Sequence, residues 1–176
     1  MKITSVKQGQ GLEACQAGQF CLYENENYNA SGSARIWIFA PDAGKQWEGW
    51  NFNGLTVANR GRSAANNLAE HDVCLYDNWS EPQSTDCILM ERGDRLPSLN
   101  NVSSGEGGRK IEHNGTLHDG GPAPEPHGAT VHMNNRLGSI TTTKNTGPSQ
   151  RPSFGEVLRK PVRMERHLGD DSDLIK

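Results

Sequence analysis

Four cysteines are the residues of this chain best suited to covalent or metal chemistry: Cys15, Cys21, Cys74 and Cys87. They fall into two neighbouring pairs, one with five residues between its members and one with twelve. Structural zinc sites prefer about two to four residues between paired ligands, so this spacing disfavours zinc. Disulfides would stabilise a small domain by restricting its unfolded state, but four cysteines allow three pairings. The alternative is four buried thiols that act as small hydrophobic side chains.

Nothing else in the sequence is spaced as an enzyme active site would be. Ser103, Ser104 and His71 are present, but no spacing joins them with an acid into a nucleophile–base set. The chain has no Gly-x-Ser-x-Gly elbow, no phosphate-binding loop and no His-Glu-x-x-His motif. We therefore expect a protein that binds without catalysing a reaction and that needs no cofactor.

Short apolar runs must position the cysteines. Residues 20–23 and 73–76 each contain one cysteine, and residues 35–39 and 87–90 are two further runs rich in strand-forming residues. Clusters of Gly, Asn, Ser and Pro separate them. No sustained helical periodicity occurs in the first 104 residues, so the pattern predicts an all-β fold.

Aromatic residues divide the chain into two unequal parts. All four Trp, all three Tyr and three of the four Phe precede residue 105, and Phe154 is the one aromatic residue after it. Because aromatic side chains dominate core burial, we expect a β domain over residues 1–104. Residues 105–176 are predicted to be an extended Gly/Pro/polar arm that orders on a partner. The spacing of Ser153 and Glu156 predicts one short helix in this arm.

Charge and hydropathy exclude several partners. The net charge of −3 and the pI near 6.1 argue against a nucleic-acid-binding protein. No apolar run approaches the roughly 20 residues of a membrane-spanning helix. The first residues lack the apolar segment of a secretory signal, so we expect synthesis in the cytoplasm and a mature protein that resides in a virion or outside the cell.

An internal repeat relates two parts of the predicted β domain. Residues 20–25 recur as residues 73–78, each with an apolar residue, Cys, Leu, Tyr, an acid and Asn in the same order. Each copy is followed by a second apolar run and then by an Asn/Ser-rich turn, at residues 59–63 and 100–104. The repeat predicts two similar β units, each covering the apolar face of the other.

The segment Cys15-Gln-Ala-Gly-Gln-Phe-Cys-Leu-Tyr-Glu-Asn25 resembles the start of the bacterial metalloproteinase-inhibitor family with a βγ-crystallin-like fold. Residues 73–77 together with Cys87 resemble the second half of that family, so the resemblance covers about residues 13–104. It implies two tandem Greek-key units in a small sandwich. It also implies the disulfides Cys15–Cys21 and Cys74–Cys87.

The resemblance also raises calcium binding, because many βγ-crystallin units bind Ca²⁺ through an Asn/Asp-rich turn that ends in Ser. In the first unit, residues 58–63 place Ala58 and Arg62 where ligands would be expected. In the second unit, residues 99–104 begin with Leu99, and the remaining ligand candidates are Asn100, Asn101, Ser103 and Ser104. The alternative is a turn whose side chains hydrogen-bond its own backbone.

Two further interpretations concern apolar residues. Trp47, Trp50 and Phe52 are interpreted as core, with an exposed aromatic binding loop as the alternative. Scattered apolar residues of the predicted arm are candidate anchors for grooves of a partner. These anchors are Val131, Met133, Leu137, Ile140, Phe154, Val157 and Leu158.

The long predicted arm favours one function over two others. We expect a non-enzymatic structural protein whose β domain decorates or cements a larger assembly, such as a bacteriophage capsid or tail, because 72 residues are far too many for an ordinary connection. The alternative implied by the resemblance is a peptidase inhibitor, in which a rigid disulfide-braced loop occupies the cleft of a peptidase. A weaker alternative is a calcium-binding βγ-crystallin module.

Overall fold

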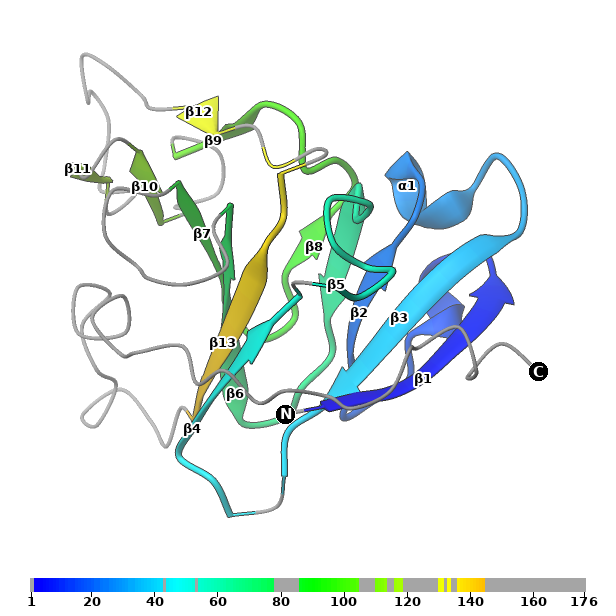
Figure 1. The fold of residues 1–176 in the computed structure, drawn as a ribbon, viewed down its shortest axis with the longest axis horizontal. Coiled ribbons are helices and arrows are strands. Elements are labelled where there is room, and N and C mark those ends of the chain that lie inside the picture. Colours follow the sequence, from blue (N-terminus) through cyan, green and yellow to red (C-terminus); the bar gives the residue numbers. More distant parts are fainter. Residues whose placement is uncertain are drawn as a thin grey trace.

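Two antiparallel β-sheets pack face to face in the computed structural model (Figure 1). The structure describes residues 2–42, 44–52, 54–77, 86–104, 110–113, 116–118, 130–131, 133 and 136–144. Within this part of the chain the helices are limited to two short turns, η1 (Leu12–Ala14) and α1 (Glu26–Asn29). The predicted all-β class is therefore confirmed.

The first sheet has the strand order β1-β3-β2-β5-β8. Its members are β1 (Lys2–Gly9), β2 (Phe20–Tyr23), β3 (Ala34–Ala40), β5 (Ser63–Asn66) and β8 (Arg95–Leu96). The second sheet has the order β11-β10-β7-β6-β13-β4. Its members are β4 (Trp47–Asn51), β6 (His71–Tyr76), β7 (Cys87–Met90), β10 (Ile111–His113), β11 (Thr116–His118) and β13 (Ser139–Lys144). A small separate pair joins β9 (Val102–Ser103) to β12 (Thr130–Val131).

The strand orders reveal two Greek-key units that exchange their third strands. Unit 1 consists of β2, β3, β4 and β5, and its β4 pairs in the second sheet; unit 2 consists of β6, β7, β8 and β13, and its β8 pairs in the first sheet. The register is the same in both units, because Tyr23 pairs with Ser63 and Tyr76 pairs with Ser139. Equivalent backbone hydrogen bonds accompany this register: Arg62 N–H donates to the Tyr23 carbonyl at 2.8 Å, and Gly138 N–H donates to the Tyr76 carbonyl at 2.9 Å.

This symmetry confirms the internal repeat and corrects one part of it. The turn predicted to match residues 59–63 was 100–104, but the fourth strand of unit 2 is β13, so its matching turn precedes Ser139. Sequence around the two turns agrees, since Asn59-Arg60 and Asn135-Arg136 both lie four and three residues before the first Ser of the strand. The connection between β8 and β13 is much longer than that between β4 and β5, which hides the match in the sequence.

The central position of β13 overturns the predicted boundary at residue 104. β13 lies between β4 and β6 and pairs with both (Figure 1). Four residues predicted as anchors for a partner, Val131, Met133, Leu137 and Ile140, are fully buried in the main core of this chain. Those side chains are therefore not available to another molecule. The other three predicted anchors, Phe154, Val157 and Leu158, lie outside the described residues, as does the predicted helix.

The main core lies between the two sheets. Alternation along β2 directs Phe20 and Leu22 into it and Cys21 and Tyr23 to the outer face. The Phe39 ring contacts the rings of Phe20 and Phe52, with centroid distances of 5.9 and 5.7 Å. Trp50 and Phe52 are buried, which confirms that they are core residues, and the side chain of Trp47 lies outside the described part.

The outer face of each sheet carries a smaller apolar cluster. On the first sheet, Ala14, Cys15 and Tyr28 cover Cys21, Tyr23 and their neighbours on β3 and β5. On the second, Cys74, Tyr76, Cys87 and Leu89 form the corresponding cluster. The connections after β1 and β2 therefore cover the outer face of the first sheet. Over the described residues, the structure contains no helix long and apolar enough to cross a membrane.

Candidate functional site

The disulfide Cys15–Cys21 braces the connection between β1 and β2. Cys21 is a fully buried residue of β2, and Cys15 is nearly buried at the end of η1. The predicted pairing of these two cysteines is confirmed. The bond joins the connection directly to a central strand of the first sheet. We define residues 10–19 as the disulfide loop.

Hydrogen bonds fix the disulfide loop at both of its ends. Gly11 N–H donates to the Tyr28 carbonyl at 2.7 Å, and the Tyr23 hydroxyl donates to the Gly11 carbonyl at 3.3 Å. At the other end, Gly18 N–H donates to the Asn67 carbonyl at 2.8 Å, and Asn67 N–H donates to the Gln19 carbonyl at 2.9 Å. The Asn67 side-chain amide also donates to the Cys15 carbonyl. The loop is therefore held in one conformation by β2, β5 and α1.

The α1 turn beside the loop has an uncommon backbone conformation. Asn27, Tyr28 and Asn29 are consecutive and have positive φ angles of 49°, 58° and 61°. This left-handed conformation costs about 1–2 kcal/mol per residue for L-amino acids, so specific contacts must stabilise it. Asn27 N–H donates to the Pro97 carbonyl at 2.7 Å, and Tyr28 N–H donates to the Ser63 hydroxyl at 3.1 Å.

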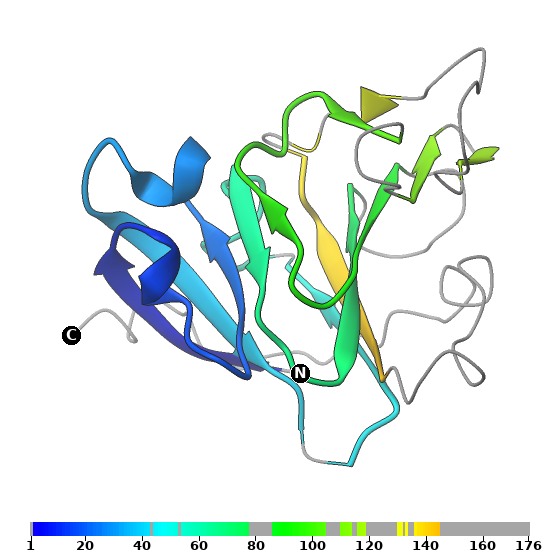
Figure 2. The same ribbon diagram turned by 180° about the vertical axis from the view of Figure 1, so that it is seen from behind.

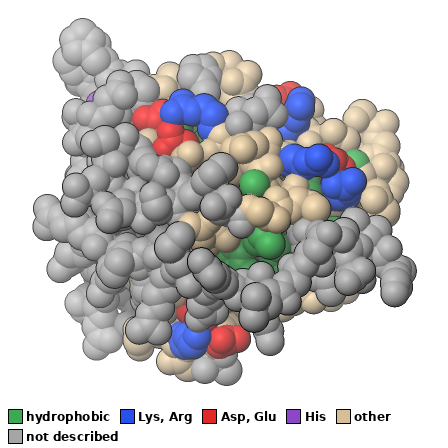
Figure 3. All heavy atoms as spheres, in the orientation of Figure 1, with side chains coloured by type: hydrophobic (Ala, Val, Ile, Leu, Met, Phe, Trp, Pro, Cys, Tyr) green, Lys and Arg blue, Asp and Glu red, His purple; other side chains and the backbone are tan. Residues whose placement is uncertain are grey.

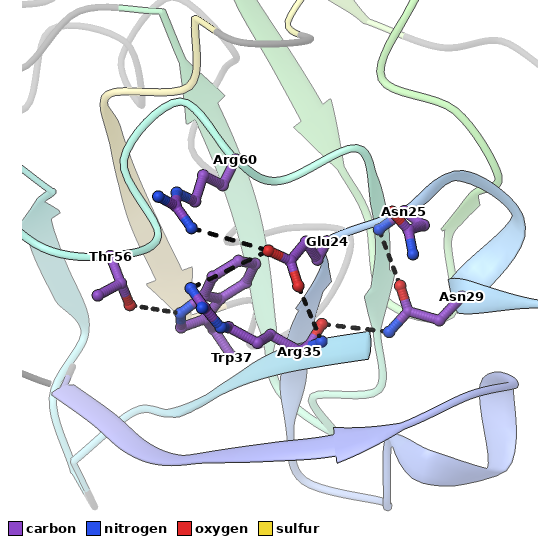
Figure 4. Close-up of polar contacts among 7 residues, drawn as sticks. All are labelled: Glu24, Asn25, Asn29, Arg35, Trp37, Thr56 and Arg60. Atoms are coloured by element: carbon purple, nitrogen blue, oxygen red, sulfur yellow. Dashed lines mark hydrogen bonds and ion pairs between the residues drawn. The ribbon is translucent and has the colours of Figure 1, made fainter. Parts of the chain in front are cut away.

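Asn29 fixes the α1 turn from within. Its side-chain amide donates to the carbonyls of Gly9 at 3.0 Å and Arg35 at 3.1 Å, and its side-chain oxygen accepts from Asn25 N–H at 2.8 Å (Figure 4). The Tyr28 ring packs edge-on against Tyr23 with a centroid distance of 5.5 Å. In Figure 2 the dark-blue turn that follows β1 lies beside α1. The disulfide loop and α1 thus form one rigid end of the first sheet.

Each repeat unit also carries a carboxylate bound by an arginine of its last turn. In unit 1, Glu24 lies between Arg35 at 4.0 Å and Arg60 at 3.8 Å (Figure 4). Arg35 N–H donates to Glu24 at 3.2 Å, which holds the hairpin from β2 to β3 closed. Trp37, on the same strand as Arg35, donates from its indole N–H to the Thr56 hydroxyl at 3.2 Å. These groups are therefore paired within the domain.

Unit 2 repeats this arrangement with two acids. Arg136 forms ion pairs with Asp77 and, at 3.5 Å, with Asp86. Asp86 N–H donates to the Asp77 carboxylate at 3.0 Å, as Arg35 N–H does to Glu24. Burial raises the pKa of Asp77, and the Arg136 guanidinium opposes that rise. In Figure 3 the described acidic and basic side chains lie beside one another in small groups. The described part of this face therefore has no large patch of a single charge sign.

The second disulfide implied by the resemblance is wrong. Cys74 and Cys87 are both buried, and no disulfide joins them. In the register of β6 and β7, Cys74 pairs with Leu89 and Cys87 pairs with Tyr76, so the two cysteines are diagonal neighbours. Diagonal residues are about 7–8 Å apart in an antiparallel pair, whereas disulfides join Cα atoms about 4.4–6.8 Å apart.

The residues proposed for calcium lie at the start of β9. Asn100 and Asn101 are exposed, and Asn101 has a positive φ of 58°. Asn100 N–H donates to the Ser98 hydroxyl at 3.1 Å, the Ser103 and Thr130 hydroxyls are 3.2 Å apart, and Ser104 is buried. Calcium binding at this turn stays a prediction. No group of three or more His, Cys, Asp or Glu that could hold a metal ion occurs in the described ranges.

Sequence reasoning did not single out the tip of the disulfide loop. Leu12 is 37% exposed and is the one large hydrophobic residue exposed in the described part of the chain. Its neighbours Glu13, Gln16, Ala17 and Gly18 are exposed too. The sequence does contain one indication of this residue, because Leu12 is the one large apolar residue in the segment between Gly9 and Cys15. The geometry presents an apolar side chain on a rigid loop, which suits non-covalent binding to a protein.

We expect removal of the disulfide to loosen this loop selectively. The double substitution Cys15→Ser/Cys21→Ser should lower the free energy of unfolding by about 2 kcal/mol, since the bond closes a short loop in the unfolded chain. Urea denaturation measures this loss, and amide exchange should accelerate in residues 10–19. As a control, Cys74→Ala removes the thiol at the equivalent position of unit 2 and should leave exchange in that loop unchanged. Unaltered exchange in the double variant would contradict a bracing role.

Because Tyr23 is buried at the base of the loop, we expect the free energy of unfolding to fall at high pH. Burial raises the pKa of Tyr23 from 10.0 to about 12, and burial also raises the pKa of Tyr76. The unfolded chain releases these protons first as the pH rises, so the two tyrosines do not change stability below pH 10, and Tyr23 lowers it between pH 10 and about 12. Urea denaturation across this range measures the fall. Tyr23→Phe should show a smaller fall than the unmodified chain, and an equal fall would contradict the assignment to Tyr23.

Comparison with known families bears on the same part of the chain. Residues 8–88, just under half of the chain, match a family model described as peptidase inhibitor family I36. No curated protein and no solved structure matches the chain. The match begins two residues before the disulfide loop and includes β2 to β6 and the start of β7. Over residues 8–88 this chain therefore has the sequence pattern of peptidase inhibitor family I36, which confirms the family resemblance predicted from its sequence.

Proposed function

We propose that this protein is an inhibitor of an endopeptidase, and specifically of a zinc metallopeptidase. The match of residues 8–88 to a family of peptidase inhibitors is the observation that carries the proposal. The choice of a metallopeptidase rests on the resemblance of residues 15–25 to the metalloproteinase-inhibitor family. Inhibitors of this kind act by binding, which agrees with a sequence that lacks the spacing of an enzyme.

The geometry of the disulfide loop supports this proposal. A loop that is ordered before binding loses little conformational freedom when it enters a cleft, so more of the contact energy appears as affinity. Complexes between peptidases and their inhibitors typically form with little backbone movement. The disulfide Cys15–Cys21 and the hydrogen bonds of Gly11 and Gly18 supply that order here.

The assembly function that we expected from the sequence loses its structural basis. It required apolar residues after position 104 to remain free for a partner. Val131, Met133, Leu137 and Ile140 instead complete the core of the same chain. We therefore do not retain a capsid or tail protein as a candidate function.

The disulfide also supports a location for the mature protein. Disulfides persist in oxidising compartments and are rare in the reducing cytosol. Cys15–Cys21 therefore favours action outside the cytosol, where secreted peptidases also act.

Steady-state inhibition of a panel of purified endopeptidases tests the proposal. The full chain should inhibit at least one zinc metallopeptidase with a Ki below about 1 μM, a value that corresponds to about −8 kcal/mol of binding free energy. Serine, cysteine and aspartic peptidases complete the panel and show whether inhibition is selective. The substitution Ile140→Asp, which should unfold the domain, provides the control that inhibition needs the folded chain. No inhibition of any panel member at 10-fold higher concentrations would overturn the proposal.

A further inference from the structure

We infer that the disulfide loop is the segment that contacts the peptidase and that Leu12 is its anchor. The inference rests on the proposed function and adds to it the contact residue and the specificity of the partner. The matching enzyme is an endopeptidase with a specificity pocket for a branched aliphatic side chain. Three features of the loop support it: the exposure of Leu12, the rigidity of its backbone and the conformation of η1.

Exposure distinguishes Leu12 from every other large apolar side chain in the described residues. It is 37% exposed, whereas the large hydrophobic side chains that the structure describes in the two sheets are buried. The surrounding exposed residues Gln16, Ala17 and Gly18 are uncharged, and Glu13 is the one acid at the tip. Binding energy at interfaces concentrates in a few central side chains that fill pockets and are surrounded by weaker contacts. Leu12, one exposed apolar side chain among small or polar neighbours, has that arrangement.

The backbone that carries Leu12 is fixed directly on both sides. Gly11 has a φ of 80°, a left-handed conformation that favours glycine, and its N–H donates to the Tyr28 carbonyl at 2.7 Å. Three residues after Leu12, Cys15 is bonded to β2. The position of the Leu12 side chain is therefore set by the first sheet rather than by the partner.

The conformation of η1 predicts how the loop would occupy a cleft. A peptide bound as an extended strand offers its backbone N–H and C=O groups to the edge of its receptor. In η1 these groups bond within the loop instead, since Cys15 N–H donates to the Leu12 carbonyl at 3.0 Å and Ala14 N–H donates to the Gly11 carbonyl at 3.3 Å. A turn closed in this way would bind as a compact projection rather than as an extended strand, so its peptide bonds would not be presented for cleavage.

Gln46 offers a matched control position at the opposite end of the first sheet. Gly9 pairs with Ala34 at one end of β3, and Lys2 pairs with Ala40 at the other. The disulfide loop follows Gly9, whereas the connection that contains Gln46 follows Ala40, so β3 separates the two positions along its whole length. Gln46 is exposed, so an aspartate there introduces the same group without disturbing the core.

The test measures the Ki of the full chain and three variants against the metallopeptidase that the full chain inhibits best. Leu12→Asp should weaken inhibition at least 30-fold, as expected for loss of an anchor in an apolar pocket. Leu12→Met replaces the branched side chain by an unbranched apolar one of similar size and should weaken inhibition by less than about 10-fold. Gln46→Asp should leave Ki unchanged. Thermal unfolding of each variant should coincide with that of the full chain, because neither Leu12 nor Gln46 belongs to the main core.

Mass spectrometry of the chain after incubation with the enzyme tests the mode of binding. The chain should be recovered uncut between residues 10 and 19. If Leu12→Asp inhibits as well as the full chain, the inference is overturned while the proposed function stands. Cleavage within the loop at the rate of a substrate would also overturn it. Absence of inhibition by the full chain would overturn both.

Discussion

A chain that ends at Ser104 is expected to be unfolded. Truncation there removes β13, which lies between β4 and β6 and pairs with both along its length. The second sheet would lose its centre, and backbone groups of β4 and β6 would lose their partners in a buried setting, where each unpaired group costs about 1–3 kcal/mol. The main core would also lose Ile111, Val131, Met133, Leu137 and Ile140.

Circular dichroism and amide exchange of residues 1–104 against the full chain measure this effect. A point substitution separates loss of the strand from loss of length: Ile140→Asp buries a carboxylate opposite Leu75 and Trp50 and should cost more than about 3 kcal/mol. Ile140→Val removes one methylene from the same site and should cost about 0.5–1.5 kcal/mol. A folded, exchange-protected 1–104 fragment would show that β13 is dispensable.

Among substitutions of a single polar residue, we expect Asn66→Leu to lower the free energy of unfolding most. Asn66 is fully buried at the end of β5, and its side-chain amide donates to the carbonyls of His71 and Met90, both at 3.1 Å, and of Glu91 at 3.2 Å. Its side-chain oxygen accepts from Leu68 N–H at 3.1 Å. One side chain of the first sheet thus binds the start of β6 and the end of β7 in the second sheet.

Leucine at this position would leave those backbone groups without that partner. Because an unsatisfied buried polar group costs about 1–3 kcal/mol, we expect a loss of at least about 3 kcal/mol in the free energy of unfolding. Chemical denaturation measures it, and Asn100→Leu is the matched control, since Asn100 is exposed and should change stability by less than about 0.5 kcal/mol. Equal effects of the two substitutions would show that Asn66 does not join the sheets.

The internal repeat made much of this fold predictable from the sequence. Because residues 20–25 and 73–78 share residue types position by position, they identify the first strands of the two units. The interpretation of Trp50 and Phe52 as core residues is also confirmed. Residue types were sufficient here because these strands carry large apolar side chains at alternate positions.

β13 was missed because its composition is unlike that of an aromatic-rich core strand. Ser139–Lys144 contains three consecutive threonines and a single large apolar residue, Ile140. A strand paired on both sides needs few large side chains of its own, since its neighbours supply the apolar surface. The Thr141 hydroxyl is hydrogen-bonded to the Tyr76 hydroxyl at 3.2 Å, so this buried polar side chain has a partner. Composition alone therefore placed this strand in an arm.

The candidate site was only partly predictable. The cysteine spacing left three pairings open, and the resemblance selected Cys15–Cys21 correctly and Cys74–Cys87 incorrectly. The register of β6 against β7 keeps Cys74 and Cys87 from pairing, and the spacing of two cysteines in the sequence does not reveal that register. Leu12 could not be ranked from sequence, because its exposure depends on how η1 and α1 cover the outer face of the first sheet.

A stoichiometric titration tests the central claim that this chain is a folded inhibitor of a metallopeptidase. The full chain is added stepwise to an active-site-titrated zinc metallopeptidase at a concentration well above Ki, and residual activity is followed with a small synthetic substrate. We expect activity to fall linearly to near zero at one molar equivalent of the chain and to return on dilution with the chain intact. Undiminished activity at several molar equivalents would contradict the claim.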